Sequence, residues 1–224
     1  MKRIALLSFP IMFAVVFLGL WVTLLWPTTP AQAEIPTVLV DDFAVTQEPI
    51  SVNDTDTFSS SIVADPADNF LGLERELSLE LAAGTFADAQ IAAGQLEFRA
   101  PASAVTLTLS WTDTTGTDIT AGGLQNAFAL TVAEADTAIP LSLTLSTDGV
   151  NISAISTTIN ATAAPQTYII PFTAFTLVSG TGAEFSDVDD ITLRLAANNL
   201  NGLTLSNFTT ANTIASILTD ELFV

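Results

Sequence analysis

The chain has 224 residues and a formal net charge of −19, and all 24 acidic residues follow residue 33. Histidine and cysteine are absent, which excludes histidine-assisted serine hydrolysis, zinc sites built from those residues, and disulfide bonds. After residue 33 the only cations are Arg75, Arg99 and Arg194, so we expect no binding to nucleic acid, whose phosphates require cations.

The N-terminal segment predicts export from the cytoplasm. Lys2 and Arg3 precede an apolar run over residues 4–26, and Ala31-Gln32-Ala33 has the small residues of a cleavage site. We interpret residues 1–33 as a signal peptide. The apolar run also approaches the length that spans a bilayer, so the alternative is an uncleaved hydrophobic helix that anchors the protein to a membrane. Both alternatives predict an extracellular or cell-surface location.

Alternation of apolar and polar residues begins near residue 38 and continues through most of the chain, which is the pattern of half-buried β-strands. The apolar positions with the clearest alternation are Val38, Val40, Leu73, Leu77, Leu79, Leu81, Val105, Leu107, Leu109, Trp111, Phe128, Leu130, Val132, Ile139, Leu141, Leu143, Leu145, Tyr168, Ile170, Phe172, Ile191, Leu193, Leu195, Leu203 and Leu205. Threonine is frequent on the opposite parity, where it suits a pleated, solvated surface.

Turn-forming residues separate these runs. They are Asp113–Asp118 around Gly116, Gly122-Gly123, Asp148-Gly149, Gly180–Gly182 and Asn198–Gly202. The spacing predicts nine or ten strands and no long helix between them. We therefore expect an all-β fold, an antiparallel two-sheet jelly-roll sandwich over residues 38–210. A linker at 34–37 precedes it, and a short helical cap or tail at 211–224 follows.

Several short sequence segments occur in an order that is typical of one group of proteins. They are Asp41-Asp42-Phe43, Gly72-Leu73-Glu74-Arg75-Glu76-Leu77, Asp118-Ile119-Thr120-Ala121-Gly122-Gly123, Ile170-Pro171-Phe172, and Phe185-Ser186-Asp187-Val188-Asp189-Asp190-Ile191. Over about residues 38–210 the chain resembles secreted bacterial, cyanobacterial-type jelly-roll proteins that carry PEP-CTERM sorting tails, and galactose-binding-like domains. No Val-Pro-Glu-Pro signature follows residue 210, so we do not expect the sorting tail itself.

The densest acidic set is a candidate calcium site, formed by Asp41, Asp42, Asp187, Asp189 and Asp190. Calcium takes six to eight oxygen ligands, and the first and last strands of a jelly roll often pair, which would bring these residues together. The resemblance to galactose-binding-like domains also implies calcium near the opening acidic pair, although Ser206-Asn207-Phe208 lacks the aspartate that helps there. The alternative is that these residues simply occupy strand ends. For Asp113 and Asp118, beside Gly116, we favour a turn.

Arg75 and Trp111 are the candidate ligand-binding residues. Arg75 shares its parity with leucines, so it either binds a carboxylate or sugar hydroxyl or pairs with an internal acid such as Glu97. Arg99 and Arg194 have the same two alternatives. Trp111, the only tryptophan after the N-terminal segment, either stacks on a sugar ring or continues the core, and its parity favours the core.

These observations favour an exported, non-catalytic β-sandwich with a structural, adhesive or matrix-associated role at the cell surface. The alternative is a calcium-assisted carbohydrate-binding module, with an extracellular glycan as partner. A more distant alternative is a carboxylate-based glycoside hydrolase that uses Glu74, Glu76 or Glu80, which alternate on one strand face. Membrane contact is expected only through an uncleaved N-terminal segment.

Overall fold

The computed structural model describes residues 35–64 and 69–213. The predicted signal peptide or membrane helix at 1–33 and most of the predicted cap at 211–224 lie outside the described residues. Within the described ranges, no helix has both the length and the apolar character needed to cross a membrane.

Twelve strands and one 3-10 helix make up the regular structure of these ranges. The strands are β1 (Leu39–Asp41), β2 (Gln47–Asn53), β3 (Phe58–Ala64), β4 (Glu74–Ala83), β5 (Phe86–Ala92), β6 (Gln95–Thr112), β7 (Ala127–Ala135), β8 (Ile139–Thr147), β9 (Asn151–Ile159), β10 (Gln166–Pro171), β11 (Thr176–Ser179) and β12 (Asp190–Ala211), and the helix η1 spans Phe172–Ala174.

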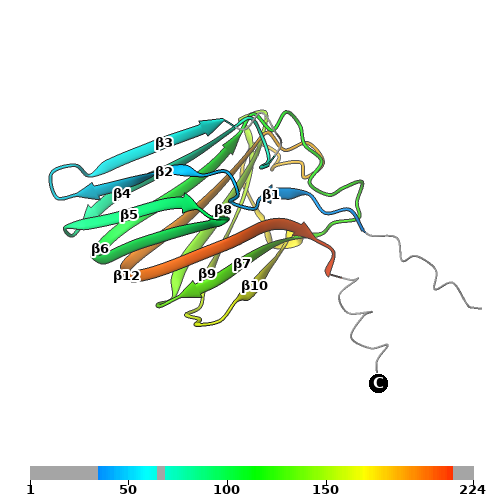
Figure 1. Ribbon diagram of the computed structural model, residues 1–224. Coiled ribbons are helices and arrows are strands. Elements are labelled where there is room, and N and C mark those ends of the chain that lie inside the picture. Colours follow the sequence, from blue (N-terminus) through cyan, green and yellow to red (C-terminus); the bar gives the residue numbers. More distant parts are fainter. Residues whose placement is uncertain (1–34, 65–68, 214–224) are drawn as a thin grey trace, which may run out of the picture. The chain divides into compact units, whose positions relative to one another are not determined.

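The strands pair antiparallel throughout and form two layers (Figure 1). One layer has the order β11-β9-β8-β12-β6-β4-β3. In the other layer, β7 lies between β10 and the second half of β12 and pairs with both. In the same layer, β5 lies between β2 and the first half of β6 and pairs with both. β1 lies against the end of β12. The predicted all-β, antiparallel two-sheet sandwich is confirmed.

β6 and β12 belong to both layers because each of them bends near its middle. Their mutual register shifts between Asn198 and Leu203, and Ala102 and Asn199 have positive φ angles of 52° and 61°. Asn199 Oδ1 accepts a hydrogen bond from the Ala102 backbone N–H at 3.1 Å, which joins the two bends. The turn predicted at Asn198–Gly202 is wrong, because β12 continues through it. Asparagine tolerates the left-handed conformation in a bulge as well as in a turn.

The core lies between the layers and contains the inward parity of each strand. The alternation predicted for β4, β6, β8 and β12 is confirmed, with one exception: Leu73 is 59% exposed. Aromatic rings form a continuous chain through the core. The Phe208 ring centroid lies 5.6 Å from that of Trp111 and 5.2 Å from that of Phe128, and Phe128 lies 5.1 Å from Phe172. These spacings are typical of favourable ring pairs.

Gly72 allows β4 to start close against β6. Its φ angle is +87°, a conformation that residues with a side chain rarely adopt. A Cβ atom at this position would collide with the Thr112 carbonyl oxygen. The glycine therefore sets how closely the segment before β4 approaches the end of β6.

Candidate functional site

A buried polar cluster surrounds Arg75. Its Nη1 donates to both carboxylate oxygens of Asp41, at 2.9 and 2.7 Å. Nε donates to Gln47 Oε1 at 3.0 Å, and Nη2 donates to the Val45 carbonyl oxygen at 2.6 Å. The guanidinium carbon lies 4.8 Å from the Phe70 ring centroid, within cation–π range. The cluster therefore supplies a counter-charge and hydrogen-bond acceptors to a guanidinium that is completely buried.

Asp41 accepts two further hydrogen bonds, from the Phe43 backbone N–H at 2.7 Å and from Trp111 Nε1 at 2.9 Å. Burial raises the pKa of Asp41 above its ordinary value, while the charge of Arg75 and these hydrogen bonds oppose the rise. The carboxylate thus links the first strand to β4 and β6 through the core.

Neither predicted ligand-binding residue lies where a ligand at the surface could contact it, because Arg75 and Trp111 have no exposed area. The internal partner of Arg75 is Asp41. The suggested partner Glu97 instead accepts a hydrogen bond from Gln90 Nε2 at 2.7 Å. Sequence reasoning missed the pairing with Asp41 because a contact over 34 residues leaves no local pattern.

The aspartates predicted to hold calcium do not form one group. Asp41 is surrounded by protein donors, and Asp42 Oδ1 accepts a hydrogen bond from the Ala44 backbone N–H at 2.9 Å. Over residues 35–64 and 69–213, no set of three or more acidic side chains is arranged to hold a metal ion. Calcium binding therefore stays a prediction without an assembled ligand set.

The remaining three aspartates lie at the start of β12 and in the segment before it. Asp189 accepts hydrogen bonds from the backbone N–H groups of Gly116, at 3.0 Å, and Asp148. These bonds join the loops that contain Gly116 and Asp148 to the residue just before β12. Burial raises the pKa of Asp190, and the nearby charges of Asp189 and Asp113 raise it further.

The Asp113–Asp118 segment, predicted as a turn around Gly116, bends at Gly116 and leads into a hydrogen-bonded turn that begins at Asp118. Asp118 Oδ1 accepts hydrogen bonds from the Thr120 backbone N–H and hydroxyl, and Oδ2 accepts one from the Gly122 N–H at 2.8 Å. These bonds lower the pKa of the Asp118 carboxyl. Its partner in the acidic pair, Asp113, has a φ angle of 55° at the end of β6.

We expect the substitution Asp190→Asn to raise the melting temperature at pH 7. A carboxyl whose pKa is raised in the folded state destabilises that state once it ionises. This loss of stability is absent below the unfolded-state pKa of about 3.9, and it appears as the pH rises through the pKa of the folded state. The gain over wild type should therefore grow from pH 3.5 to pH 7. Glu80→Gln, at an exposed position, is the matched control. A gain at pH 3.5 as large as at pH 7 would contradict this explanation.

The outward face of the first layer carries mainly hydroxyl groups. We call it the hydroxyl face. Its central residues are Thr106, Thr108, Ser110 and Thr112 on β6, Thr192 and Arg194 on β12, and Ser142 and Thr144 on β8. Towards the β3 edge the face adds Glu74, Glu76, Glu80, Phe58 and Ile62. Phe58 and Ile62 are 57% and 61% exposed, so the edge of the face offers an aromatic and an aliphatic surface.

Arg194 stands near the middle of the hydroxyl face. Thr108 lies opposite it on β6, and Ser142 lies opposite it on β8. Arg75 pairs with Asp41 and Arg99 with Asp88, whereas the Arg194 side chain has no hydrogen bond or ion pair within the described part of the chain. The sequence shows the hydroxyl residues on this parity, but it does not show which of them flank the arginine.

A shallow groove on this face contains Arg194, and we call it the Arg194 groove. Its volume is about 220 Å³. Its lining residues are Thr106, Pro140, Leu141, Ser142, Ser156, Thr157, Arg194 and Ala196. No carboxylate lines it. The volume is below the roughly 300–1,000 Å³ of enclosed small-molecule pockets, so a ligand here would lie along the surface.

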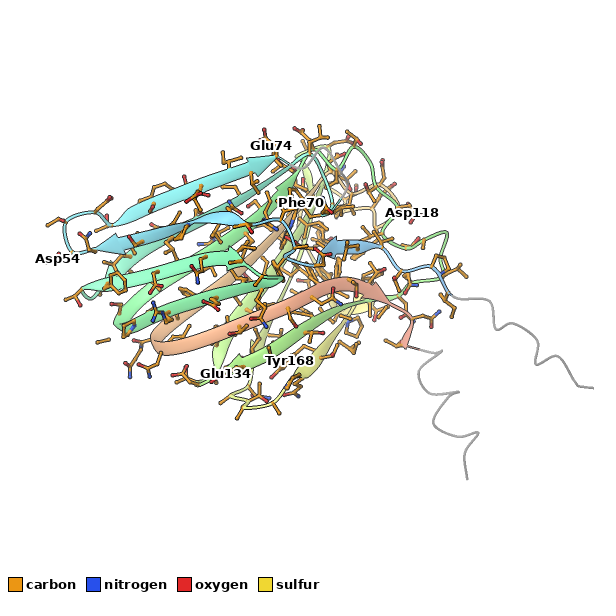
Figure 2. All side chains as sticks on the ribbon, viewed as in Figure 1. Asp54, Phe70, Glu74, Asp118, Glu134 and Tyr168 are labelled. Atoms are coloured by element: carbon orange, nitrogen blue, oxygen red, sulfur yellow. The ribbon has the colours of Figure 1, made fainter. Side chains whose placement is uncertain are left out.

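A second groove lies between two loops at one end of the sandwich, and we call it the loop-end groove. Phe70 and Asp118 mark this end in Figure 2, and Asp54 marks the opposite end. The groove has a volume of about 320 Å³ and is lined by Leu39, Phe70, Leu71, Gly72, Leu73, Asp113, Thr114, Thr115 and Thr117. It combines apolar side chains with hydroxyls and one carboxylate, so it is the main alternative to the Arg194 groove as a ligand-binding site.

The chain matches no family model and no curated protein. Among solved structures, it is similar to the family 11 carbohydrate-binding module of the cellulosomal cellulase Lic26A-Cel5E of Clostridium thermocellum. The two are 11% identical with a TM-score of 0.45, and the match covers 81% of this chain and 97% of that one.

Two further solved structures are similar to a comparable extent. One is the family 30 carbohydrate-binding module of the cellulosomal cellulase Cel9D-Cel44B of Clostridium thermocellum, at 10% identity and a TM-score of 0.44, covering 80% of this chain and 98% of that one. The other is a family 11 module from Clostridium thermocellum in complex with a β-1,3-1,4-mixed-linked tetrasaccharide, at 13% identity and a TM-score of 0.42, covering 79% and 95%.

Proposed function

We propose that this protein is an exported, non-catalytic glycan-binding β-sandwich, and that its binding surface is the hydroxyl face. The observation that carries the proposal is the exposed, unpaired guanidinium of Arg194 inside a groove of hydroxyl side chains. Adhesion to a cell surface or matrix would follow from such binding.

The chemistry of the groove suits a polyhydroxylated ligand. A guanidinium has five N–H donors and no acceptor, while serine and threonine hydroxyls both donate and accept. Thr108 and Ser142 flank Arg194, so hydroxyl groups of a sugar meet donors and acceptors side by side. A hydrogen bond to a charged group contributes about 1.5–3 kcal/mol, more than a neutral one.

The face is also long enough for several sugar rings. Arg194 on β12 is separated from the β3 edge by β6 and β4, and the strand register places Phe58 and Ile62 roughly 16 Å from it. An apolar sugar face packs on an exposed aromatic ring, and the guanidinium binds hydroxyls further along. The arrangement favours an oligosaccharide that crosses the strands.

The absence of catalysis is part of the proposal. Glu74, Glu76 and Glu80 project from the same side of β4, and their neighbours on β6 are threonine and serine. Glycoside hydrolysis needs two carboxyl groups on opposite sides of the scissile bond. Neither the Arg194 groove nor the loop-end groove has a glutamate in its lining, so neither places a sugar between two of these carboxyl groups, and we expect no turnover on a panel of oligosaccharides.

The test is a glycan array probed with the mature protein, followed by calorimetry on the best ligand. We expect Arg194→Gln to weaken binding by roughly ten- to a hundredfold, the effect of losing hydrogen bonds from a charged donor. Arg99→Gln is the matched control, because Arg99 is 61% exposed on the other layer and pairs with Asp88. Equal affinity of Arg194→Gln and wild type for every ligand found, or no ligand at all, would refute the proposal.

A further inference from the structure

The charges around Arg194 narrow the class of glycan. We propose that the Arg194 groove recognises a carboxylate on its ligand, namely a uronate unit carried by an otherwise neutral glycan. This inference rests on the proposed function and adds a specificity to it. It follows from three properties of the groove: the missing internal partner, the neutral surroundings and the charge of the rest of the protein.

The lack of an ion-pair partner for the Arg194 side chain is unusual in this protein. Acidic residues outnumber cations 24 to 5, and the other two described arginines each pair with an aspartate. Arg194 is exposed on a face that also carries glutamates, yet it pairs with none of them. Its forked guanidinium therefore keeps the donor geometry that matches a carboxylate through two parallel hydrogen bonds.

The surroundings of Arg194 are neutral in every direction. Thr192 and Ala196 flank it along β12, and Thr108 and Ser142 flank it across the sheet. The acidic residues that share this face are further away. Ser78 on β4 lies two strand spacings from Arg194, and Glu76 and Glu80 are each two residues further along β4, so their backbones lie about 12 Å from that of Arg194. Asp190 lies about 13 Å from Arg194 along β12. A ligand carboxylate at Arg194 thus meets one cation and hydroxyl donors, with no carboxylate in contact.

The net charge limits how many carboxylates the ligand carries. The protein has a formal charge of −19, and Glu74, Glu76 and Glu80 lie on the same face as Arg194. This field repels a polyanion such as a continuous polyuronate. A neutral chain with a single uronate substituent gains the local pairing at Arg194 without the accumulated repulsion. We therefore expect sparse uronates to be preferred to contiguous ones.

The experiment compares matched pairs of oligosaccharides that differ only at the carboxyl group. The first pair is a xylo-oligosaccharide with one glucuronate substituent and the same compound after reduction of the carboxyl group to an alcohol. Two more pairs have galactan and mannan backbones, and an oligogalacturonide serves as the polyanion. Calorimetry in 50 mM salt gives affinities for wild type, Arg194→Gln, Arg194→Lys and the control Arg99→Gln.

For at least one backbone, we expect the acid to bind wild type roughly ten times more tightly than its reduced form. Arg194→Gln should abolish that difference, Arg194→Lys should retain part of it, and Arg99→Gln should leave it unchanged. Raising the salt to 0.5 M should reduce the preference, because screening weakens an exposed ion pair.

Reduced forms that bind wild type as tightly as the acids would overturn this inference and leave the proposed function standing. Acids that fail to bind on all three backbones would overturn it as well. Binding of any neutral glycan on the array then shows whether the proposed function survives. A tighter complex with the oligogalacturonide than with the singly substituted acids would contradict the argument from net charge.

Discussion

Replacing Arg75 by methionine is expected to lower the free energy of unfolding by about 3–5 kcal/mol, as measured by urea denaturation at pH 7. The substitution keeps the apolar stem but removes the charge, which leaves the Asp41 carboxylate buried without its counter-ion. Gln47 Oε1 and the Val45 carbonyl oxygen lose their donors in the same step.

Two controls separate this effect from a general loss of packing. Arg99→Met removes an arginine from an exposed ion pair, so it should change the free energy by less than about 1 kcal/mol. The double variant Asp41→Asn/Arg75→Met removes both charges, and it should lose less than the sum of the single variants. An Arg75→Met protein within 1 kcal/mol of wild type would show that the buried pair is not formed in solution.

Truncating Trp111 to alanine is expected to cost about 3–5 kcal/mol of unfolding free energy, the usual cost of removing a buried aromatic side chain. Its ring is fully buried against Phe208, and its Nε1 donates to Asp41. Trp111→Phe keeps most of the ring but not the donor, so it should cost about 1–3 kcal/mol. Both values come from denaturant titrations followed by circular dichroism.

The same two variants decide between the two roles considered for Trp111. If Trp111 is a core residue, both substitutions lower the free energy of unfolding and leave the affinity of the folded protein for its glycan unchanged. Variants of wild-type stability with a weakened affinity would instead place the ring at a binding surface, contrary to the packing described above.

The strands that could be recognised from the sequence are those with large inward side chains. In β4, β6, β8 and β12 leucines alternate with polar residues, and this pattern predicts both the strand and the buried face. β5 buries Ala87 and Ala89, whose small side chains give little contrast with their neighbours. β11 is exposed at all four residues, so no alternation marks it. Such strands are held mainly by their neighbours.

The continuity of β6 and β12 could not be predicted either. Pro101 and Asn198–Gly202 are typical of turns, and only the pairing of the two bends shows that both strands pass from one layer to the other. The candidate site has a similar limit. The sequence identifies Arg194 as one of three cations, but its isolation from every acidic residue depends on the register of β12 with β6 and β8.

The most direct test of the account is to map the binding surface by NMR, following backbone amide shifts during titration with the tightest oligosaccharide from the array. A glycan bound on the hydroxyl face should shift the amides of outward residues on β6, β8 and β12 around Arg194, extending towards Phe58, and these shifts should be lost in Arg194→Gln. Shifts confined to the loop-end groove at Asp113–Thr117, or to the outward face of the layer that contains β2, β5 and β7, would contradict it.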